Sequence, residues 1–387
     1  MQVKPSVQNL LCTAITVVVR ISSRCNLACD YCYAKASNRP DRVSSFMSSE
    51  TASLVCEQFL SLPVDRVDFN WHGGEPLLSE PAVLRNALQT QQRLYMGGSA
   101  PAINKIQTNG THFSDEWLTL LCEYPIDIGI SLDGPARFHN RHRSVTDERP
   151  TSCHDEVIAN MAKLRKIGLP FGTLLVITED MAFAAKEVFD FVNDEQLSVD
   201  LLPCFCHGTL GNVVPPSIHP HSLSRFMQEY FDEWIRHPDP PTCRILEDML
   251  GGVLGIKPRT CAFRNHCHEF YSVDTDGRLY PCDLFLGQQD MCLGDLHSES
   301  LLSILSSPHT ATIRSSIATL PDDCNECDWL VACGGGCSAH RIGQTLDSVG
   351  RYYFCGARKS IFKHIEAFML SNASLFSTAK AAMREKL

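Results

Sequence analysis

Near its N-terminus the chain reads Ser23-Arg24-Cys25-Asn26-Leu27-Ala28-Cys29-Asp30-Tyr31-Cys32-Tyr33, with three cysteines at the spacing C-x3-C-x2-C and an aromatic residue on each side of the last one. Three thiolates this close together can hold three irons of a [4Fe–4S] cube and leave the fourth iron open. A structural zinc ion would need a fourth ligand at a matching spacing. His72 is far along the chain and Asp30 lies inside the loop, so neither meets that need. Buried structural cysteines, or a zinc site completed at long range, are the alternatives.

The loop follows the first of six apolar segments that alternate with helical patterns. We expect strands at 14–21, 66–71, 104–108, 127–132, 171–177 and 198–203. Helical patterns separate them at 48–62, 80–95, 115–123, 154–167 and 183–193. This alternation predicts βαβ units and a parallel sheet, and six strands favour a barrel or partial barrel. Active sites in such barrels form at the carboxyl ends of the strands, which is where the cysteine loop begins.

The loop resembles that of the radical S-adenosylmethionine (SAM) superfamily, whose members carry C-x3-C-x-aromatic-C after the first barrel strand. The resemblance implies an α/β fold with a partial (β/α)6 barrel of the TIM type. It implies that Cys25, Cys29 and Cys32 hold a [4Fe–4S] cluster whose open iron binds SAM. One electron then cleaves SAM to a 5′-deoxyadenosyl radical, and the protein holds the reactive carbon against the substrate and excludes water.

Further strand ends match the SAM site of this superfamily. The second strand ends in Trp71-His72-Gly73-Gly74-Glu75-Pro76, which looks like the GGEP motif. By resemblance its backbone and Glu75 receive the SAM ammonium, and the glycines let the backbone approach a ligand closely. By resemblance Ser131, at the end of the fourth strand, contacts the SAM ribose. Arg143 contacts the carboxylate of SAM or the substrate, or else is a solvated loop charge.

Cysteines are dense again in the C-terminal third, as Cys261-x5-Cys267-x14-Cys282, Cys324-x2-Cys327-x5-Cys333-x3-Cys337 and Cys355. Eight thiolates suffice for two fully ligated [4Fe–4S] clusters, or for two zinc sites with four thiolates each. The pattern resembles the SPASM extension of radical SAM enzymes. By resemblance the nearer cluster is held by Cys261, Cys267, Cys282 and Cys337, and the other by Cys324, Cys327, Cys333 and Cys355. Such clusters cannot activate SAM but can carry electrons.

Asp283 directly follows Cys282 and is a candidate catalytic residue. In the sulfatase-maturating enzymes that the chain resembles, an Asp at this position is proposed to take a proton from the substrate as its radical is oxidised, a role that a nearby carboxylate can fill. The alternative is a carboxylate that only forms a hydrogen bond near the cluster. Most of the other cysteines are expected to be small buried residues: Cys12, Cys56, Cys122, Cys153, Cys204, Cys206, Cys243 and Cys292.

Composition and charge exclude several classes. The chain has 387 residues, 44% hydrophobic and 20% charged, which allows two or three domains with a large core and excludes global disorder. A net charge of −10 without a long Lys/Arg run argues against a nucleic-acid partner. No apolar run approaches the roughly 18 residues of a membrane span. The apolar run 10–19 lacks a small-residue cleavage site, so we interpret it as a strand and expect a cytoplasmic protein.

Changes in periodicity and composition along the sequence divide the chain into four segments. We expect a radical SAM barrel over 13–235, a helical linker over 236–257, a SPASM domain over 258–368 and a tail over 369–387. Helices are expected at 221–236, 244–254 and 358–369. After residue 258 helical periodicity fades, and Asp274–Gly277 predicts a hairpin turn.

The substrate class rests on resemblance to SPASM enzymes that modify peptides or proteins. One branch comprises maturases of ribosomally made peptides that form cyclophanes, joining an aromatic ring to a neighbouring Cβ. The segment Cys333-Gly334-Gly335-Gly336-Cys337-Ser338-Ala339-His340-Arg341 favours this branch. The other branch comprises anaerobic sulfatase-maturating enzymes, which oxidise Cys or Ser to formylglycine; the auxiliary cysteine spacing and Asp283 favour it. We expect the peptide maturase.

The expected partners are a precursor peptide or protein and a one-electron donor such as flavodoxin or ferredoxin. The non-enzyme alternatives are an electron-transfer protein and a zinc-binding interaction protein. Neither an electron-transfer protein nor a zinc-binding protein would need an iron with an open coordination site or a GGEP motif.

Overall fold

The structure is a computed structural model that describes residues 14–36, 44–144, 152–206, 213–343, 346 and 348–372. Cys12 and residues 373–387 of the expected tail lie outside these ranges. The chain forms two compact units that are interleaved along the sequence. The first comprises residues 1–131, 143–171 and 267–317, and the second comprises residues 132–142, 172–266 and 318–387.

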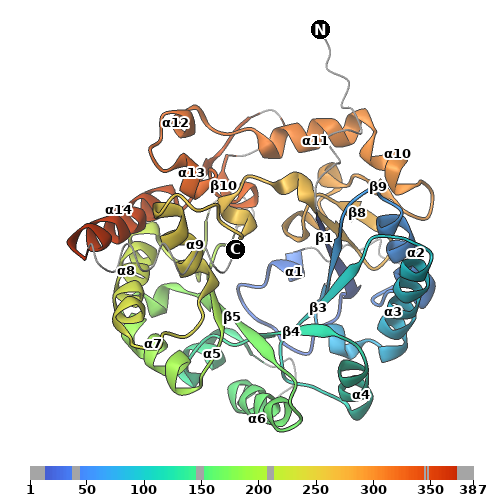
Figure 1. The fold of residues 1–387 in the computed structure, drawn as a ribbon, viewed down its shortest axis with the longest axis horizontal. Helices are drawn as coiled ribbons and strands as arrows, with labels where there is room; N and C mark the ends of the chain where they lie inside the picture. Colours follow the sequence, from blue (N-terminus) through green and yellow to red (C-terminus); the bar gives the residue numbers. More distant parts are fainter. Residues whose placement is uncertain are drawn as a thin grey trace. The chain divides into compact units, whose positions relative to one another are not determined.

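A mixed sheet organises the first unit, with its strands in the order β4-β3-β2-β1-β7-β8-β9 (Figure 1). The strands are β1 (Ile15–Ser22), β2 (Val67–Gly73), β3 (Ala102–Thr108), β4 (Ile126–Ser131), β7 (Phe270–Val273), β8 (Arg278–Tyr280) and β9 (Gly294–Asp295). Neighbours from β4 to β7 are parallel, while β7, β8 and β9 are antiparallel. Almost every residue of the central β1 is buried, as expected for a parallel strand covered on both faces.

Helices cover the sheet of the first unit. They are α1 (Tyr33–Ala36), α2 (Ser49–Leu60), α3 (Pro81–Met96), α4 (Asp115–Glu123), α6 (Cys153–Lys166), α10 (Leu301–Leu305) and α11 (Pro308–Ala318). A serine caps α2, α4 and α6, because the hydroxyls of Ser48, Ser114 and Ser152 each accept a hydrogen bond from an amide of the first turn. The apolar faces of these helices are buried, for example at Phe59 and Trp117.

The second unit pairs β5 (Phe171–Ile177) with β6 (Val199–Pro203) in parallel, and β10 (Arg341–Ile342) with β11 (Arg351–Tyr352) antiparallel. Its helices are α5 (Ala136–His142), α7 (Ala185–Asp194), α8 (Pro220–Arg236), α9 (Arg244–Val253), α12 (Asp322–Asn325), α13 (Leu330–Cys333) and α14 (Cys355–Ser371). Aromatic side chains join α8 to α14, where the rings of the buried Phe231 and the half-buried Phe368 meet edge to face at 5.6 Å.

The predicted α/β class with parallel strands is confirmed, and the six expected strands are β1 to β6. The hairpin at Asp274–Gly277 is confirmed as the turn between β7 and β8. After residue 258, where helical periodicity fades in the sequence, the structure also forms the helices α10 to α13. These helices are short or weakly amphipathic, and α13 carries a cysteine of the C-terminal array, so periodicity did not indicate them.

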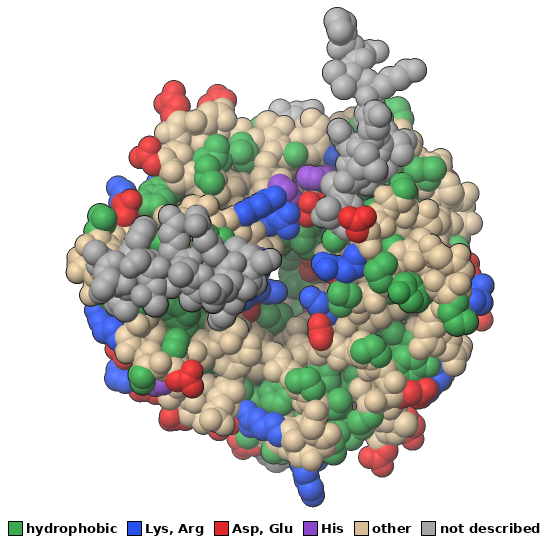
Figure 2. Space-filling view, in the orientation of Figure 1, with side chains coloured by type: hydrophobic (Ala, Val, Ile, Leu, Met, Phe, Trp, Pro, Cys, Tyr) green, Lys and Arg blue, Asp and Glu red, His purple; other side chains and the backbone are tan. Residues whose placement is uncertain are grey.

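Among the helices that the structure describes, none combines the length and apolar character needed to cross a bilayer. On the face that Figure 2 shows, acidic and basic side chains are interspersed with apolar ones.

Candidate functional site

The three cysteines of the loop between β1 and α1 lie together. Cys25, Cys29 and Cys32 pack with Leu27 in one cluster of buried and half-buried side chains. Sγ of Cys25 accepts weak hydrogen bonds from the Leu27 amide at 3.4 Å and from Nδ2 of Asn109 at 3.6 Å. Burial raises the pKa of the Cys25 thiol, and coordination to a metal would favour its thiolate form. Clustered thiols with donors to a sulfur fit an iron–sulfur cluster.

A fourth cysteine packs against this loop. Cys153, the first residue of α6, belongs to the same cluster of side chains and is buried, as expected. The other cysteines without a predicted ligand role divide as follows: Cys56, Cys204 and Cys243 are buried, Cys206 and Cys292 are half-buried, and Cys122 is exposed.

The two glycines of the GGEP motif bring the end of β2 against the start of the cysteine loop. A Cβ atom on Gly73 would lie 2.3 Å from the Ser22 carbonyl oxygen, and one on Gly74 would lie 2.3 Å from the Arg24 carbonyl oxygen. The amides of Gly74 and Glu75 donate to those same two oxygens, each at 2.7 Å. The sequence predicts that these glycines let the backbone approach a ligand closely. The structure shows that they also let the end of β2 approach the backbone of the cysteine loop closely.

Glu75 is fully buried and ties the end of β2 to the end of β3. Its Oε1 accepts hydrogen bonds from the Leu77 amide at 2.9 Å and from Oγ1 of Thr108 at 2.7 Å, and its Oε2 accepts one from the Asn109 amide at 2.7 Å. Burial nevertheless outweighs these three bonds and raises the pKa of Glu75 to about 7. The arrangement gives Glu75 a positioning role in addition to the predicted contact with the SAM ammonium.

Ser131 lies at a strand end, and Arg143 lies beside the cysteine loop. Ser131 ends β4, and its Oγ accepts a hydrogen bond of 3.1 Å from Nε2 of Gln107, at the end of β3. The Arg143 guanidinium lies 5.5 Å from the ring centre of Tyr31, inside the cysteine loop. Arg143 is only 7% exposed, so the alternative of a solvated loop charge is wrong. Its predicted contact with a carboxylate stays a prediction.

Asp283 lies against the cysteine loop, although 250 residues separate it from Tyr33. Its Oδ2 accepts a hydrogen bond of 2.6 Å from the Tyr33 hydroxyl, and its Oδ1 is 3.1 Å from Sγ of Cys282. Desolvation of its hydroxyl and the neighbouring Asp283 carboxylate raise the pKa of Tyr33 well above its usual value, although 37% of the residue is exposed. The carboxylate thus lies between the loop and a predicted cluster ligand.

Sequence reasoning gave no role to Tyr33 or to His72. The rings of these residues lie 6.4 Å apart. Burial lowers the pKa of His72, although the nearby Asp283 carboxylate acts in the opposite direction. The lowered pKa favours the neutral ring at neutral pH. Nδ1 of His72 lies 2.7 Å from the Gly73 amide nitrogen and 3.1 Å from the Gly73 carbonyl oxygen. The available signals were an aromatic residue directly after Cys32 and a histidine directly before the glycine pair.

The predicted ligands of the nearer auxiliary cluster are divided between the two units. Cys267 and Cys282 belong to the first unit, and Cys261 and Cys337 belong to the second. This ligand set therefore stays a prediction.

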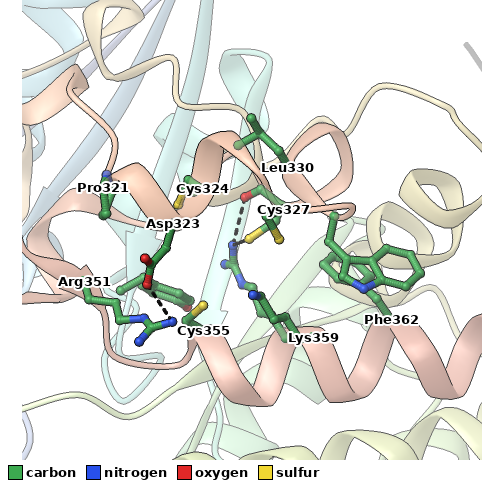
Figure 3. A pocket seen from close by; sticks show the side chains of 14 residues that line it. Pro321, Asp323, Cys324, Cys327, Leu330, Arg351, Cys355, Lys359 and Phe362 are labelled. Carbon is green, nitrogen blue, oxygen red and sulfur yellow. Dashed lines mark hydrogen bonds and ion pairs between the residues drawn. The ribbon is translucent and has the colours of Figure 1, made fainter.

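The other auxiliary set lies within the second unit, where Cys324, Cys327, Cys333 and Cys355 line one pocket (Figure 3). Burial, followed by the neighbouring sulfurs of the other three, raises the pKa of the Cys324 thiol. Cys333 ends α13 and Cys355 begins α14, and a turn joins the first two cysteines through the hydrogen bond from the Cys327 amide to the Cys324 carbonyl oxygen. Four converging thiols fit either a [4Fe–4S] cluster or a zinc ion.

Comparison with known proteins distinguishes these chemistries. Residues 19–191 match the family model of the radical SAM superfamily, and residues 261–328 match that of the SPASM iron–sulfur cluster-binding domain. The chain belongs to the radical SAM superfamily. It is a radical SAM enzyme with a SPASM domain, and it uses SAM together with iron–sulfur clusters. The electron-carrier and zinc-protein alternatives are not supported.

Relatives and solved structures agree with this membership. A serine-type anaerobic sulfatase-maturating enzyme of Bacteroides thetaiotaomicron is 27% identical over 379 residues, which cover 91% of this chain and 89% of the relative. The structure of native anSMEcpe with bound AdoMet aligns with a TM-score of 0.81 at 22% identity, covering 93% of this chain and 99% of the other. Streptococcus suis SuiB bound to the precursor peptide SuiA aligns with a TM-score of 0.63 at 20% identity, covering 88% and 76%. The radical SAM enzyme therefore shares its fold with peptide-modifying proteins.

Proposed function

We propose that this radical SAM enzyme oxidises a side chain of a peptide substrate at Cβ, with Asp283 as the proton acceptor. When bound, SAM and the clusters supply the acceptor for a hydrogen atom and a route for the electron that the substrate loses. Cys25, Cys29 and Cys32 would hold the cluster that binds SAM. The backbone of Gly73 and Gly74, the carboxylate of Glu75, Ser131 and Arg143 would hold SAM itself: these are the polar groups and close backbone at the strand ends around the loop.

One observation carries this proposal, namely the position of the Asp283 carboxylate. It is hydrogen-bonded to Tyr33 of the cysteine loop and adjacent to Cys282. A carbon radical that loses an electron becomes a strong acid, and a carboxylate at that point can accept its proton. A protein that only moved electrons would have no use for a proton acceptor next to the SAM-binding loop.

For the product we propose an intramolecular cross-link of the cyclophane type in a ribosomally made precursor peptide. A bond would form between Cβ of one residue and an aromatic ring carbon of another, and the peptide would lose two hydrogens. Support comes from the resemblance of the segment Cys333–Arg341 to that branch. Packing also explains part of this segment, because a Cβ atom on Gly334 would lie 2.4 Å from the Phe263 carbonyl oxygen. The three glycines by themselves therefore support the cyclophane-forming branch less strongly than the whole segment does.

Formylglycine formation is the second candidate, and the named relative favours it. The relative from Bacteroides thetaiotaomicron is a serine-type anaerobic sulfatase-maturating enzyme, and its similarity covers most of both chains. Oxidation of Ser at Cβ to an aldehyde also removes two hydrogens, and it also needs a proton acceptor. The first step is therefore common to both candidates, and the fate of the oxidised carbon distinguishes them.

The test uses the iron-loaded enzyme, an excess of SAM and a chemical reductant in place of the proposed flavodoxin or ferredoxin donor. One peptide carries an aromatic-x-x segment and a second carries a central Ser or Cys, each with deuterium at Cβ. The proposal expects deuterium in 5′-deoxyadenosine. A peptide product that has lost two hydrogens, and whose ring resists fragmentation in the mass spectrometer, identifies the cross-link. A product that reacts with a hydrazide identifies formylglycine. Product formation with 5′-deoxyadenosine that contains no deuterium would contradict hydrogen abstraction at Cβ.

A further inference from the structure

A buried arginine lies against the cysteine pocket of the second unit. Arg358, one turn after Cys355 in α14, is 5% exposed. Its Nη1 donates to the Ala262 carbonyl oxygen at 2.7 Å, to the Cys333 carbonyl oxygen at 3.2 Å and to Sγ of Cys333 at 3.6 Å. One cation thus contacts a predicted cluster ligand directly.

Two aromatic rings hold the guanidinium of Arg358 in place. Its central carbon lies 3.9 Å from the ring centre of Phe263 and 4.5 Å from that of Tyr352. Cation–π contacts of this kind favour a desolvated arginine and restrict its rotation. The charge is therefore fixed next to the sulfur and cannot swing towards solvent.

No carboxylate of the described residues forms an ion pair with Arg358. A second arginine of the same pocket differs in this respect, because Arg351 is exposed and lies 3.0 Å from Oδ2 of Asp323. An unpaired charge is costly to bury, so its compensation has to come from another anion. The group in contact with Arg358 that can supply this negative charge is Sγ of Cys333, which becomes a thiolate when it binds a metal.

From this arrangement we propose that Arg358 raises the reduction potential of the auxiliary cluster held by Cys324, Cys327, Cys333 and Cys355. Reduction adds negative charge to an already anionic cluster, and a fixed cation with a hydrogen bond to a ligand sulfur stabilises the reduced form more than the oxidised form. The cluster becomes a better acceptor for an electron that leaves the substrate. This inference rests on the cluster chemistry of the proposed function and is independent of which product forms.

The experiment measures the midpoint potentials of the auxiliary clusters by EPR-monitored redox titration, without SAM or peptide. The parent protein carries Cys25→Ala, Cys29→Ala and Cys32→Ala, so that the SAM-binding cluster does not contribute. We expect Arg358→Gln to lower one of the two midpoint potentials by about 59 mV, which corresponds to a tenfold fall in the one-electron reduction equilibrium constant. Arg351→Gln is the matched control, because it neutralises an arginine of the same pocket that already has a carboxylate partner, and it should leave both potentials unchanged.

Iron content separates tuning from a purely structural role. If Arg358→Gln retains the iron of its parent and both potentials stay unchanged, the proposal is overturned. If Arg358→Gln loses iron, Arg358→Met becomes the deciding variant, because its unbranched apolar side chain can pack between Phe263 and Tyr352 without the charge. A lowered potential in Arg358→Met then supports the proposal, and an unchanged one overturns it. Failure of the peptide assay would not affect this titration.

Discussion

The hydroxyl of Tyr33 donates a hydrogen bond of 2.6 Å to Oδ2 of Asp283, and so connects the residue after the last cysteine of the three-cysteine loop to the residue after Cys282. The two residues lie in one compact unit, because β7 and β8 extend the sheet directly beside β1. The fold therefore places a carboxylate from the C-terminal third of the chain next to the N-terminal cysteine loop. This relationship gives the proposed proton acceptor its position.

Removal of the carboxylate should separate hydrogen abstraction from product formation. We expect Asp283→Asn to lower the rate of product formation by roughly a hundredfold or more, because a positioned general base contributes about 10²–10⁴-fold. Formation of 5′-deoxyadenosine should persist, since SAM cleavage does not need this proton acceptor. Liquid chromatography with mass spectrometry measures both compounds in one reaction. Asp290→Asn, at an exposed aspartate nearby in the chain, is the control; equal losses in both variants would contradict the role of Asp283.

Tyr33 should act through Asp283. Tyr33→Phe removes the hydrogen bond and should lower product formation by roughly ten- to a hundredfold, which corresponds to the about 1.5–3 kcal/mol of a hydrogen bond to a charged group. In the double variant with Asp283→Asn the two losses should not multiply, because both changes disable one unit. Fully multiplicative losses would show that the two residues act independently.

The three-cysteine loop should be necessary for SAM cleavage and dispensable for the auxiliary clusters. Replacement of Cys25, Cys29 and Cys32 by Ala should abolish 5′-deoxyadenosine formation and reduce the iron content from about twelve to about eight per chain, since each cubane holds four irons. Cys153→Ala is the matched control, because Cys153 packs against the same loop without a predicted ligand role. Unchanged SAM cleavage by the triple variant would count decisively against the mechanism.

The sequence predicted the fold well because its strongest signals are local. The buried parallel strands are short β-branched runs, and each expected strand overlaps an observed one, with β5 matching at both ends. The start of α14 was placed three residues late, at Arg358 instead of Cys355. Phe354 precedes this helix and provides no side-chain cap, so no start signal was present.

Contacts between distant segments carried no such signal. The hydrogen bond from Tyr33 to Asp283 and the bonds from the strand-three end to Glu75 depend on how strands pair, which spacing along the chain does not encode. Arg358 looked like an ordinary residue of an amphipathic helix until the structure showed it buried beside Cys333. Motif resemblance located the cysteines, whereas the charges around them became visible only in the folded chain.

Burial of Glu75 should make stability depend on pH around neutrality. Its folded-state pKa of about 7 lies above the 4.5 of an unperturbed Glu, so the folded protein holds this proton more tightly than the unfolded chain. The resulting stabilisation is complete below pH 4.5 and is lost as the pH rises through 7, with a total of about 3 kcal/mol. The side chain of Glu75→Gln cannot titrate, so this variant should lack the pH-dependent stabilisation.

The comparison uses melting temperatures of wild type and Glu75→Gln from pH 5 to pH 8, measured without SAM. The advantage of wild type over the variant should be larger at pH 5 than at pH 8. Glu80→Gln, at an exposed glutamate before α3, should follow the wild-type profile. Parallel profiles for wild type and Glu75→Gln would contradict a raised pKa.

Gly336 should be required for the cysteine pocket of the second unit. Its φ is +80°, and a Cβ atom there would lie 2.3 Å from the ring of Tyr352, which packs on Arg358. Gly336→Ala therefore combines backbone strain of about 1–2 kcal/mol with displacement of a buried ring, and we expect loss of roughly four irons together with a lower melting temperature. Gly343→Ala isolates the strain, because Gly343 has a φ of +74° and no atom within 4 Å of its added Cβ. That variant should lose a little stability and keep its iron. If Gly336→Ala behaves like Gly343→Ala in both measurements, the ring of Tyr352 does not support the pocket in the way its packing indicates.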